Sequence, residues 1–383
     1  MRGRAEAAGS PDSQPPVRPD GVRGDWRGQV EQSTNRPRGR NPPVAVFALV
    51  LGLCGCLSEG SPTRPPRAAT VPPAPPLASA TSLPTPLPIS TSPPSPLPTS
   101  TRASPSATPS EVPAFSHVFI IVMENKEYSQ IVGNSQAPTI QSLIQRGGLL
   151  TNYFAIRHPS LPNYLAMVGG STFNLSRDCD LCHVDAPNLA DQIEAAGRQW
   201  KAYNEDIPAP CFGVSVGEFD KSHDPFLYFD SIRQNPERCA PRVVALDSLP
   251  TDLASANPPD LIWIVPNLCD TMHDCDIAAG DAWLAQWIPL VTRSPAFQNG
   301  GVLFLTFDEG LTDRGCCGAA GGGQIATIVL SPWVTAGTHD GTLYTHYSLL
   351  HTIEEAWGFS PLGAAAGATP ITGIWRSPAS ESR

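Results

Sequence analysis

The run His117-Val-Phe-Ile-Ile-Val-Met123, followed at once by Glu124-Asn125, decides the fold. Its apolar residues are continuous rather than alternating and most are β-branched, which is typical of a strand buried on both faces of a sheet. Runs of the same character occupy residues 261–265, 302–307 and 326–330. The sequence therefore predicts a sheet that is covered on both sides.

Helical patterns lie between and after these strands. Apolar residues recur at helical spacing over residues 139–145, 188–196 and 348–357, and Gly197 supplies a stop for the second helix. Strands that alternate with helices predict an α/β domain with a mostly parallel central sheet flanked by helices. We expect one such domain, over residues 114–383.

Polar groups follow three of the predicted strands. They are Glu124-Asn125 after the first, Asp308-Glu309 after 302–307, and Asn267, Asp270, His273 and Asp274 after 261–265. Ligand sites form at the carboxyl ends of parallel strands, so these groups are expected to converge. Oxygen ligands suit Ca, Mg or Mn, and imidazoles admit Zn or Fe. The alternative is that each acidic pair is a solvated strand end or a helix cap.

Ser160 lies within His158-Pro-Ser-Leu-Pro-Asn-Tyr164, just before a helix-like stretch that carries Pro162 in its first turn. A serine at that position is expected to face free backbone N–H groups and the positive end of the helix dipole, which together could cradle a phosphoryl oxygen. The alternative is that Ser160 only caps the helix. This motif by itself does not decide between the two interpretations.

Ordered motifs across residues 115–376 resemble a bacterial phosphoesterase family. Besides the Ser160 motif, they are His117-Val-Phe-Ile-Ile-Val-Met-Glu-Asn-Lys126, Lys221-Ser-His-Asp-Pro-Phe226, Pro266-Asn267, Met272-His-Asp274, Gly280-Asp-Ala-Trp-Leu284, Phe307-Asp-Glu-Gly310 and Thr345-His-Tyr347. That family groups secreted acid phosphatases with phosphatidylcholine-type phospholipases C, and its fold resembles alkaline phosphatase. The shorter acid-phosphatase branch is the more similar one.

The resemblance implies a role for each matching position. The implied metal ligands are Glu124, Asn125, Asp308 and Glu309, and the implied catalytic residues are Ser160 as nucleophile and His273. The implied substrate-binding residues are His158, Asn163, Lys221, His223, Asp274 and His346. For His158 and Asn163 the alternative is that they only fix the loop. For His223 and His346 it is a hydrogen-bonded structural histidine.

The implied activity is metal-dependent hydrolysis of phosphoric esters through a phosphoserine, with monoesters preferred. A phosphodiesterase of the phospholipase C type and a non-catalytic surface lipoprotein are the alternatives. The substrate would be a small-molecule or lipid phosphate ester, and a monomer is expected. The formal net charge of −10 disfavours a nucleic-acid partner, which would recruit Lys and Arg.

The N-terminal third differs in composition from the rest. Residues 1–42 read as a disordered basic extension, and 43–56 read as a signal segment that is too short to span a bilayer comfortably. This segment ends in a lipobox-like Leu53-Cys-Gly-Cys56, although an ordinary cleaved signal peptide is the alternative. Residues 57–113 read as a disordered linker, because 61–113 hold 17 Pro and 18 Ser or Thr. We therefore expect an exported protein, either lipid-anchored or secreted.

Eight cysteines follow this segment, and behind an export signal they predict disulfides. Cys269–Cys275, Cys211–Cys239 and Cys179–Cys182 are the candidate pairs. The spacing of Cys179 and Cys182 also admits a zinc site. The partners of the vicinal Cys316 and Cys317 stay open.

Overall fold

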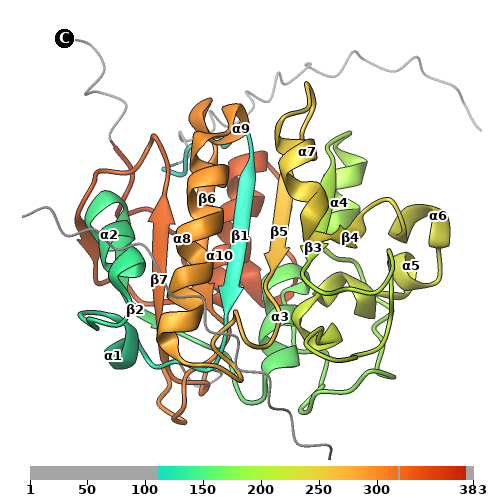
Figure 1. The fold of residues 1–383 in the computed structure, drawn as a ribbon, viewed down its shortest axis with the longest axis horizontal. Coiled ribbons are helices and arrows are strands. Elements are labelled where there is room, and N and C mark those ends of the chain that lie inside the picture. Colours follow the sequence, from blue (N-terminus) through green and yellow to red (C-terminus); the bar gives the residue numbers. More distant parts are fainter. Residues whose placement is uncertain (1–110, 318–319, 377–383) are drawn as a thin grey trace, which may run out of the picture. The chain divides into compact units, whose positions relative to one another are not determined.

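The computed structural model describes residues 111–317 and 320–376 as an α/β domain on a nine-stranded sheet (Figure 1). The strand order is β4-β3-β5-β1-β6-β7-β2-β8, and β9 pairs with β2. The strands are β1 Val118–Met123, β2 Gly148–Phe154, β3 Trp200–Asn204, β4 Val243–Ala245, β5 Leu261–Val265, β6 Val302–Phe307, β7 Gln324–Leu330, β8 Thr338–Asp340 and β9 Tyr344–Thr345.

The centre of the sheet is parallel. Val118 pairs with Leu261 of β5 on one side and with Val302 of β6 on the other. β3 and β4 continue the same direction, whereas β7 runs antiparallel to β6 and β2, as its arrow in Figure 1 shows. The predicted α/β class and mostly parallel sheet are confirmed. The direction of β7 was not predictable, because a continuous apolar run indicates burial and not orientation.

Helices cover both faces of the sheet. In Figure 1, α8 lies in front of the sheet and α10 behind it, while α2 packs against α8 and α3 against α10. The α-helices are α1 Tyr128–Ile131, α2 Pro138–Arg146, α3 Ser160–Gly169, α4 Leu189–Ala195, α5 Asp230–Arg233, α6 Pro236–Cys239, α7 Leu249–Leu253, α8 Ile277–Arg293, α9 Pro295–Gln298 and α10 His346–Trp357. Short 3₁₀ helices are η1 Lys221–His223, η2 Pro225–Tyr228, η3 Leu246–Ser248 and η4 Gly363–Gly367. The predicted helices correspond to α2, α4 and α10, and the helix-like stretch predicted after Ser160 corresponds to α3, whereas α8 was not predicted.

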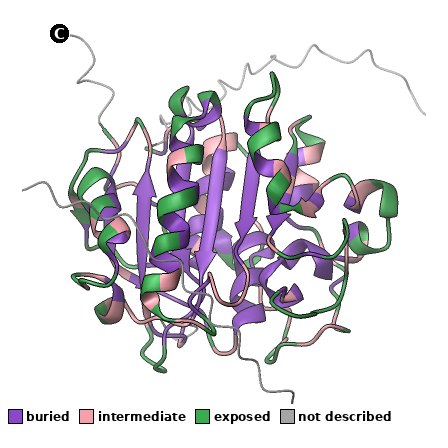
Figure 2. Cartoon of the chain, viewed as in Figure 1, coloured by how far each residue is buried: buried purple, intermediate pink, exposed green. Residues whose placement is uncertain are grey.

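The core follows the central strands, which are buried along their length (Figure 2). All six residues of β1 are buried. Trp263 of β5 packs edge-on against Phe226 and tilted against Tyr164. The strand ends therefore project from a rigid support, which is what an active site needs.

Four disulfides link loops of the domain. Three are the predicted pairs, Cys179–Cys182, Cys211–Cys239 and Cys269–Cys275. The fourth joins the neighbours Cys316 and Cys317. Because Cys179 and Cys182 are bonded to each other, the zinc alternative does not hold.

The predicted extension 1–42, signal segment 43–56 and nearly all of the linker 57–113 lie outside the described residues. Among the helices that the structure does describe, none combines the length and apolar character needed to cross a membrane.

Replacing Ile120 by alanine tests the central position of β1. Ile120 is fully buried and pairs with Trp263 and Phe304, so the cavity left by the change should lower the free energy of unfolding by about 2–5 kcal/mol. Urea-induced unfolding measures this. Leu290→Ala, at a residue 37% exposed on α8, is the control and should change stability by about 0.5 kcal/mol or less. Equal effects of the two changes would contradict the assignment.

Candidate active site

The parallel pairing of β1 with β6 brings the two acidic pairs together. Met123 pairs with Phe307, so Glu124 and Asp308 leave the sheet side by side. The backbone N–H of Asn125 donates to Asp308 Oδ1 at 3.1 Å. Asn125 has a φ of 53°, a left-handed conformation that asparagine tolerates better than most residues. The predicted convergence of these strand ends is therefore present.

Glu124 is the centre of the cluster and is fully buried. Its Oε2 accepts a hydrogen bond from Ser160 Oγ at 3.0 Å and a longer one from Asn125 Nδ2 at 3.4 Å. Its Oε1 accepts one from the Tyr164 hydroxyl at 2.5 Å and lies 3.2 Å from His223 Nε2. Four side chains from three separate segments thus point at one carboxylate.

Ser160 is the first residue of α3 and does not act as its cap. The residue before it, Pro159, occupies the N-cap position without a side-chain hydrogen bond. Ser160 directs its hydroxyl to Glu124 instead. The structure therefore does not support the capping interpretation that the sequence left open.

The helix end offers fewer free amides than predicted. The Leu161 N–H donates to Asp178 Oδ1 at 2.9 Å, and Pro162 has no N–H. The prediction that free N–H groups of the first turn cradle a phosphoryl oxygen is therefore wrong for these two positions. Asp178 fills the role that a capping side chain would have.

Asp308 has the donor chemistry of a cation ligand. Its Oδ2 is buried and accepts no hydrogen bond from any residue in the described ranges, which is unusual for a buried carboxylate. Burial raises the pKa of Asp308 to about 6, and burial together with repulsion from Asp308 raises that of Glu124 well above its usual range. A divalent cation would relieve this repulsion and give Oδ2 a partner.

The candidate ligand set depends on more than acidic side chains. Within residues 111–317 and 320–376, no group of three or more His, Cys, Asp or Glu side chains is arranged to hold a metal ion. The predicted set also includes the Asn125 side-chain amide, whose Nδ2 faces Glu124 Oε2, and the Ser160 hydroxyl lies at the same carboxylate oxygen. Such carboxylate, amide and hydroxyl oxygens fit a hard divalent cation.

Glu309 is fixed by two residues of the Ser160 loop. His158 Nδ1 lies 3.0 Å from Glu309 Oε1, and its Nε2 lies 3.1 Å from the Thr312 carbonyl oxygen. Partial burial lowers the pKa of His158, but the hydrogen bonds to Glu309 and to the Thr312 carbonyl, together with nearby negative charge, outweigh it and raise the pKa overall. Asn163 donates to Glu309 Oε2 at 3.1 Å and accepts from the Ile156 N–H. These contacts fit the alternative that His158 and Asn163 hold the loop.

Two histidines on the other side of Glu124 differ in exposure. His223 is 2% exposed, and burial lowers its pKa to about 4, so it is neutral near pH 7. The side chain of His273 is 39% exposed, with Nδ1 2.6 Å from Asp274 Oδ1. The two rings lie 6.3 Å apart. The His273–Asp274 pair therefore lies at the solvent-facing rim of the cluster.

The structure places Lys221 and His346 in structural contacts. The Lys221 ammonium donates to the Asp180 carbonyl and lies over the Tyr228 ring. His346 Nε2 lies 2.6 Å from the backbone oxygen of Asp308, and its Nδ1 lies 3.3 Å from the Tyr153 hydroxyl. Both nitrogens of His346 thus have protein partners, as expected for a structural histidine.

Tyr164 and Asp178 were not predicted as site residues. Tyr164 had a signal in the sequence, because it follows Ser160 by four residues and so lies on the same helix face. Asp178 directly precedes the Cys179–Cys182 disulfide, and no sequence pattern relates it to Ser160. Only the chain path brings it to the start of α3.

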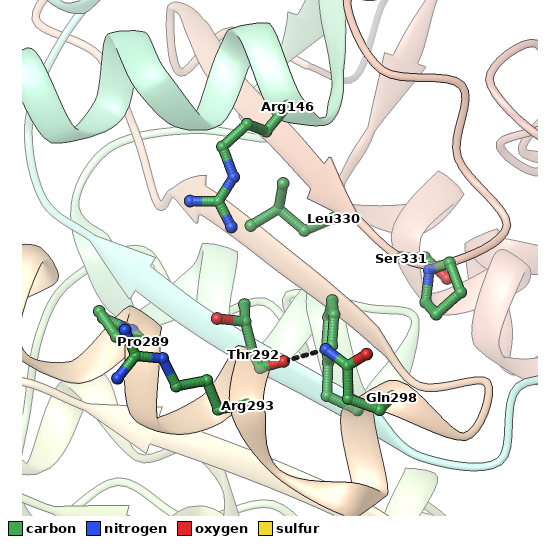
Figure 3. A pocket seen from close by; sticks show the side chains of 9 residues that line it. Arg146, Pro289, Thr292, Arg293, Gln298, Leu330 and Ser331 are labelled. Carbon is green, nitrogen blue, oxygen red and sulfur yellow. Dashed lines mark hydrogen bonds between the residues drawn. The ribbon is translucent and has the colours of Figure 1, made fainter.

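A pocket lies elsewhere in the domain. A cavity of about 430 Å³ is formed at the ends of α2 and α8, where Figure 3 shows Arg146 beside Leu330 and Arg293 beside Pro289. Leu330 pairs with Leu303 near the start of β6, whereas Asp308 follows the last residue of that strand. The pocket therefore lies at the opposite end of β6 from Asp308. None of the predicted site residues lines it. Side-chain chemistry, and not cavity size, therefore identifies the candidate active site.

The chain is similar to known phosphatases in sequence. A phosphatidylinositol-3-phosphatase of Mycobacterium tuberculosis is 35% identical over 70% of this chain and 85% of its own length. An acid phosphatase of Aspergillus fumigatus is 30% identical over 65% of this chain, which spans 56% of that protein. A protein of the alkaline phosphatase superfamily from Vibrio parahaemolyticus has a TM-score of 0.47 at 11% identity, covering 68% of this chain and 72% of that one.

A family model described as the Phosphoesterase family matches residues 133–360, which is more than half of the chain. This match includes Ser160, Tyr164, His223, His273 and the acidic pair after β6. Together with the mycobacterial relative, it shows that the chain belongs to the Phosphoesterase family and is a hydrolase of phosphoric ester bonds.

Proposed function

We propose that this protein is a metal-dependent phosphomonoesterase in which Ser160 is the nucleophile. The observation that carries the proposal is the hydrogen bond from Ser160 Oγ to the buried Glu124 carboxylate, beside the unpartnered Oδ2 of Asp308. A serine with only a capping role has no reason to face two buried carboxylates. The proposed metal ligands are Glu124, Asn125, Asp308 and Glu309, with Ser160 completing the set.

The proposed reaction has two steps. Ser160 Oγ attacks phosphorus in line with the leaving oxygen, and the serine proton passes toward Glu124 Oε2, which already accepts it in a hydrogen bond. The ester oxygen leaves and takes a proton from His273. Water then gives a proton to His273 as it attacks the phosphoserine, phosphate is released, and the serine oxygen takes its proton back from Glu124. A bound divalent cation would supply the positive charge that lowers the pKa of the hydroxyl and balances the phosphoryl charge.

Neighbouring side chains have supporting roles in this proposal. Asp274 accepts from His273 Nδ1, so a proton on that nitrogen is held and the other nitrogen is left to exchange protons. His158 and Asn163 hold Glu309. Direct substrate contacts are proposed for the exposed pair His273 and Asp274, because Lys221 and His346 are engaged within the protein.

Monoester preference is supported by the relatives. The mycobacterial protein is named a phosphatidylinositol-3-phosphatase and the fungal proteins are named acid phosphatases. Those names describe enzymes that release phosphate from monoesters. The proposed substrate class is therefore a phosphate monoester, either a small molecule or a lipid headgroup.

We also propose that the protein is exported as a monomer, either anchored through Cys56 or secreted. Four disulfides within the described residues support an oxidising compartment. Mass spectrometry of the mature N-terminus distinguishes the two forms, since only the anchored form begins with a lipid-modified Cys56.

Ser160→Ala should lower kcat on para-nitrophenyl phosphate by at least about 10³-fold, since it removes the attacking oxygen. Released para-nitrophenolate measures the rate, with metal supplied at saturation. Ser142→Ala, on the exposed face of α2, is the matched control and should keep full activity. Full activity of Ser160→Ala would show that the nucleophile is wrongly assigned.

Monoesters should be hydrolysed faster than diesters by at least about tenfold in kcat/KM, a discrimination that a few polar contacts supply. The comparison uses para-nitrophenyl phosphate, bis(para-nitrophenyl) phosphate and phosphatidylcholine, each with metal present. A preference for phosphatidylcholine would instead establish the phospholipase C alternative. No release from any ester would favour a non-catalytic surface lipoprotein.

The metal-free protein should lose stability as the pH rises from about 6.5 to about 8. Burial, followed by repulsion from Asp308, raises the pKa of Glu309 to about 8, whereas an unfolded carboxyl group titrates near about 4. The folded state therefore keeps a proton that the unfolded state has released, so a rising pH favours unfolding. Below this window the buried His223 and His346, with pKa values of about 4, act in the opposite direction.

Thermal unfolding in the presence of a chelator measures this dependence. Glu309→Gln is the control and should make the dependence shallower, because the variant has no carboxyl group to titrate at that position, while Glu205 and Glu354, with pKa values of about 7, still contribute. Added metal should stabilise the protein more at about pH 8 than at about pH 6.5, since protons compete with the metal for the same oxygens. A chelated protein that becomes more stable across this window would contradict the prediction.

A further inference from the structure

Two hydroxyl groups on α3 donate hydrogen bonds to the same carboxylate. Ser160 and Tyr164 are four residues apart, so they lie one above the other on one helix face. Ser160 Oγ donates to Glu124 Oε2 at 3.0 Å, and the Tyr164 hydroxyl donates to Oε1 at 2.5 Å. One helix turn therefore contacts both oxygens of Glu124.

Tyr164 is held firmly in this position. Its side chain is 1% exposed, and its ring stacks on His223 with centroids 5.3 Å apart and an angle of 13° between the planes. On another side its ring lies 6.3 Å from that of Trp263. A carboxylate oxygen only accepts hydrogen bonds, so the Tyr164 hydroxyl is the donor to Glu124.

The two carboxylate oxygens of Glu124 have different neighbours. Oε1 receives Tyr164 and lies beside His223 Nε2, so its surroundings are filled by protein. Oε2 lies on the side of Ser160 and Asn125, where the proposed nucleophile and a proposed ligand meet. Packing alone does not require this hydroxyl, because a phenylalanine would fill the same space and keep the stacking on His223.

We infer that Tyr164 is a positioning residue for the metal site: its hydroxyl holds Glu124 Oε1, so that Oε2 is directed toward Ser160 and the cation. This inference rests on the proposed function, in which Glu124 binds the metal. Residues that hydrogen-bond a metal ligand fix its orientation and raise metal affinity without touching the metal themselves. Tyr164 has the contact and the burial for that role.

The test is Tyr164→Phe, which removes the hydroxyl and keeps the ring. Chelator-treated protein is titrated by calorimetry with Mg²⁺, Ca²⁺, Mn²⁺ and Zn²⁺ separately, and the metal that the unaltered protein binds is carried forward. The variant should bind that metal about 10–100-fold more weakly, as is typical when such a hydrogen bond is lost. Its kcat on para-nitrophenyl phosphate should recover at saturating metal, because Ser160 is unchanged.

Tyr203→Phe is the matched control. Tyr203 is also fully buried, and its hydroxyl donates to a carboxylate, Asp252 Oδ2, at 2.7 Å, away from the Glu124 cluster. It should leave metal affinity unchanged, while thermal unfolding of the chelated proteins registers any loss of stability in both variants. A purely structural role for Tyr164 would lower stability and leave the metal titration unaltered.

The outcomes separate the inference from the proposed function. If the unaltered protein binds none of the four metals, the proposed function fails and this inference fails with it. If the unaltered protein binds metal and Tyr164→Phe binds it equally well, only the inference is overturned. A Tyr164→Phe protein that does not fold would also overturn it, since the hydroxyl would then be a requirement of the fold.

Discussion

The structure depends on two like charges, Glu124 and Asp308, that are buried next to each other. Their nearness follows from the register of β1 and β6, in which Met123 pairs with Phe307 and the next residue of each strand leaves the sheet. Burial without compensation raises the pKa of both carboxyl groups. Such a pair persists only if the surrounding fold holds it, which is common at sites with a function and rare elsewhere.

The rest of the site offsets the negative charge of Glu124 and Asp308 or holds the surrounding loops in place. Two hydrogen-bond donors from α3 converge on Glu124, His223 of η1 lies 3.2 Å from its Oε1, and the Asn125 N–H neutralises part of the charge on Asp308. Disulfides lie close in sequence to the loops that carry Asp178 and His273. The exposed pair His273 and Asp274 is at the rim, where it can exchange protons with solvent. Charged groups held in position by a rigid support are what phosphoryl transfer requires.

The sequence predicted the strands and the acidic residues at their ends, but it did not predict the contacts that surround those residues. Continuous apolar runs located β1, β5, β6 and β7, yet the antiparallel direction of β7 has no periodic signal. The alternatives for Ser160 could not be separated, because capping and catalysis favour the same residue type at the start of a helix. Lys221 matched a family motif, but its carbonyl partner at Asp180 belongs to a distant loop that no local pattern reveals.

The sequence by itself determined the α/β class, the family resemblance and the set of polar groups at the ends of β1, β5 and β6. These features are local, because one run of consecutive residues shows both that a strand is buried and which polar residue follows it. The tertiary structure decided which of those groups meet. It showed that Ser160 faces Glu124 while Asp178 caps its helix, and that Tyr164 holds the second oxygen of the same carboxylate. These are contacts between segments far apart in the chain, so they depend on strand order and helix packing and not on any local pattern.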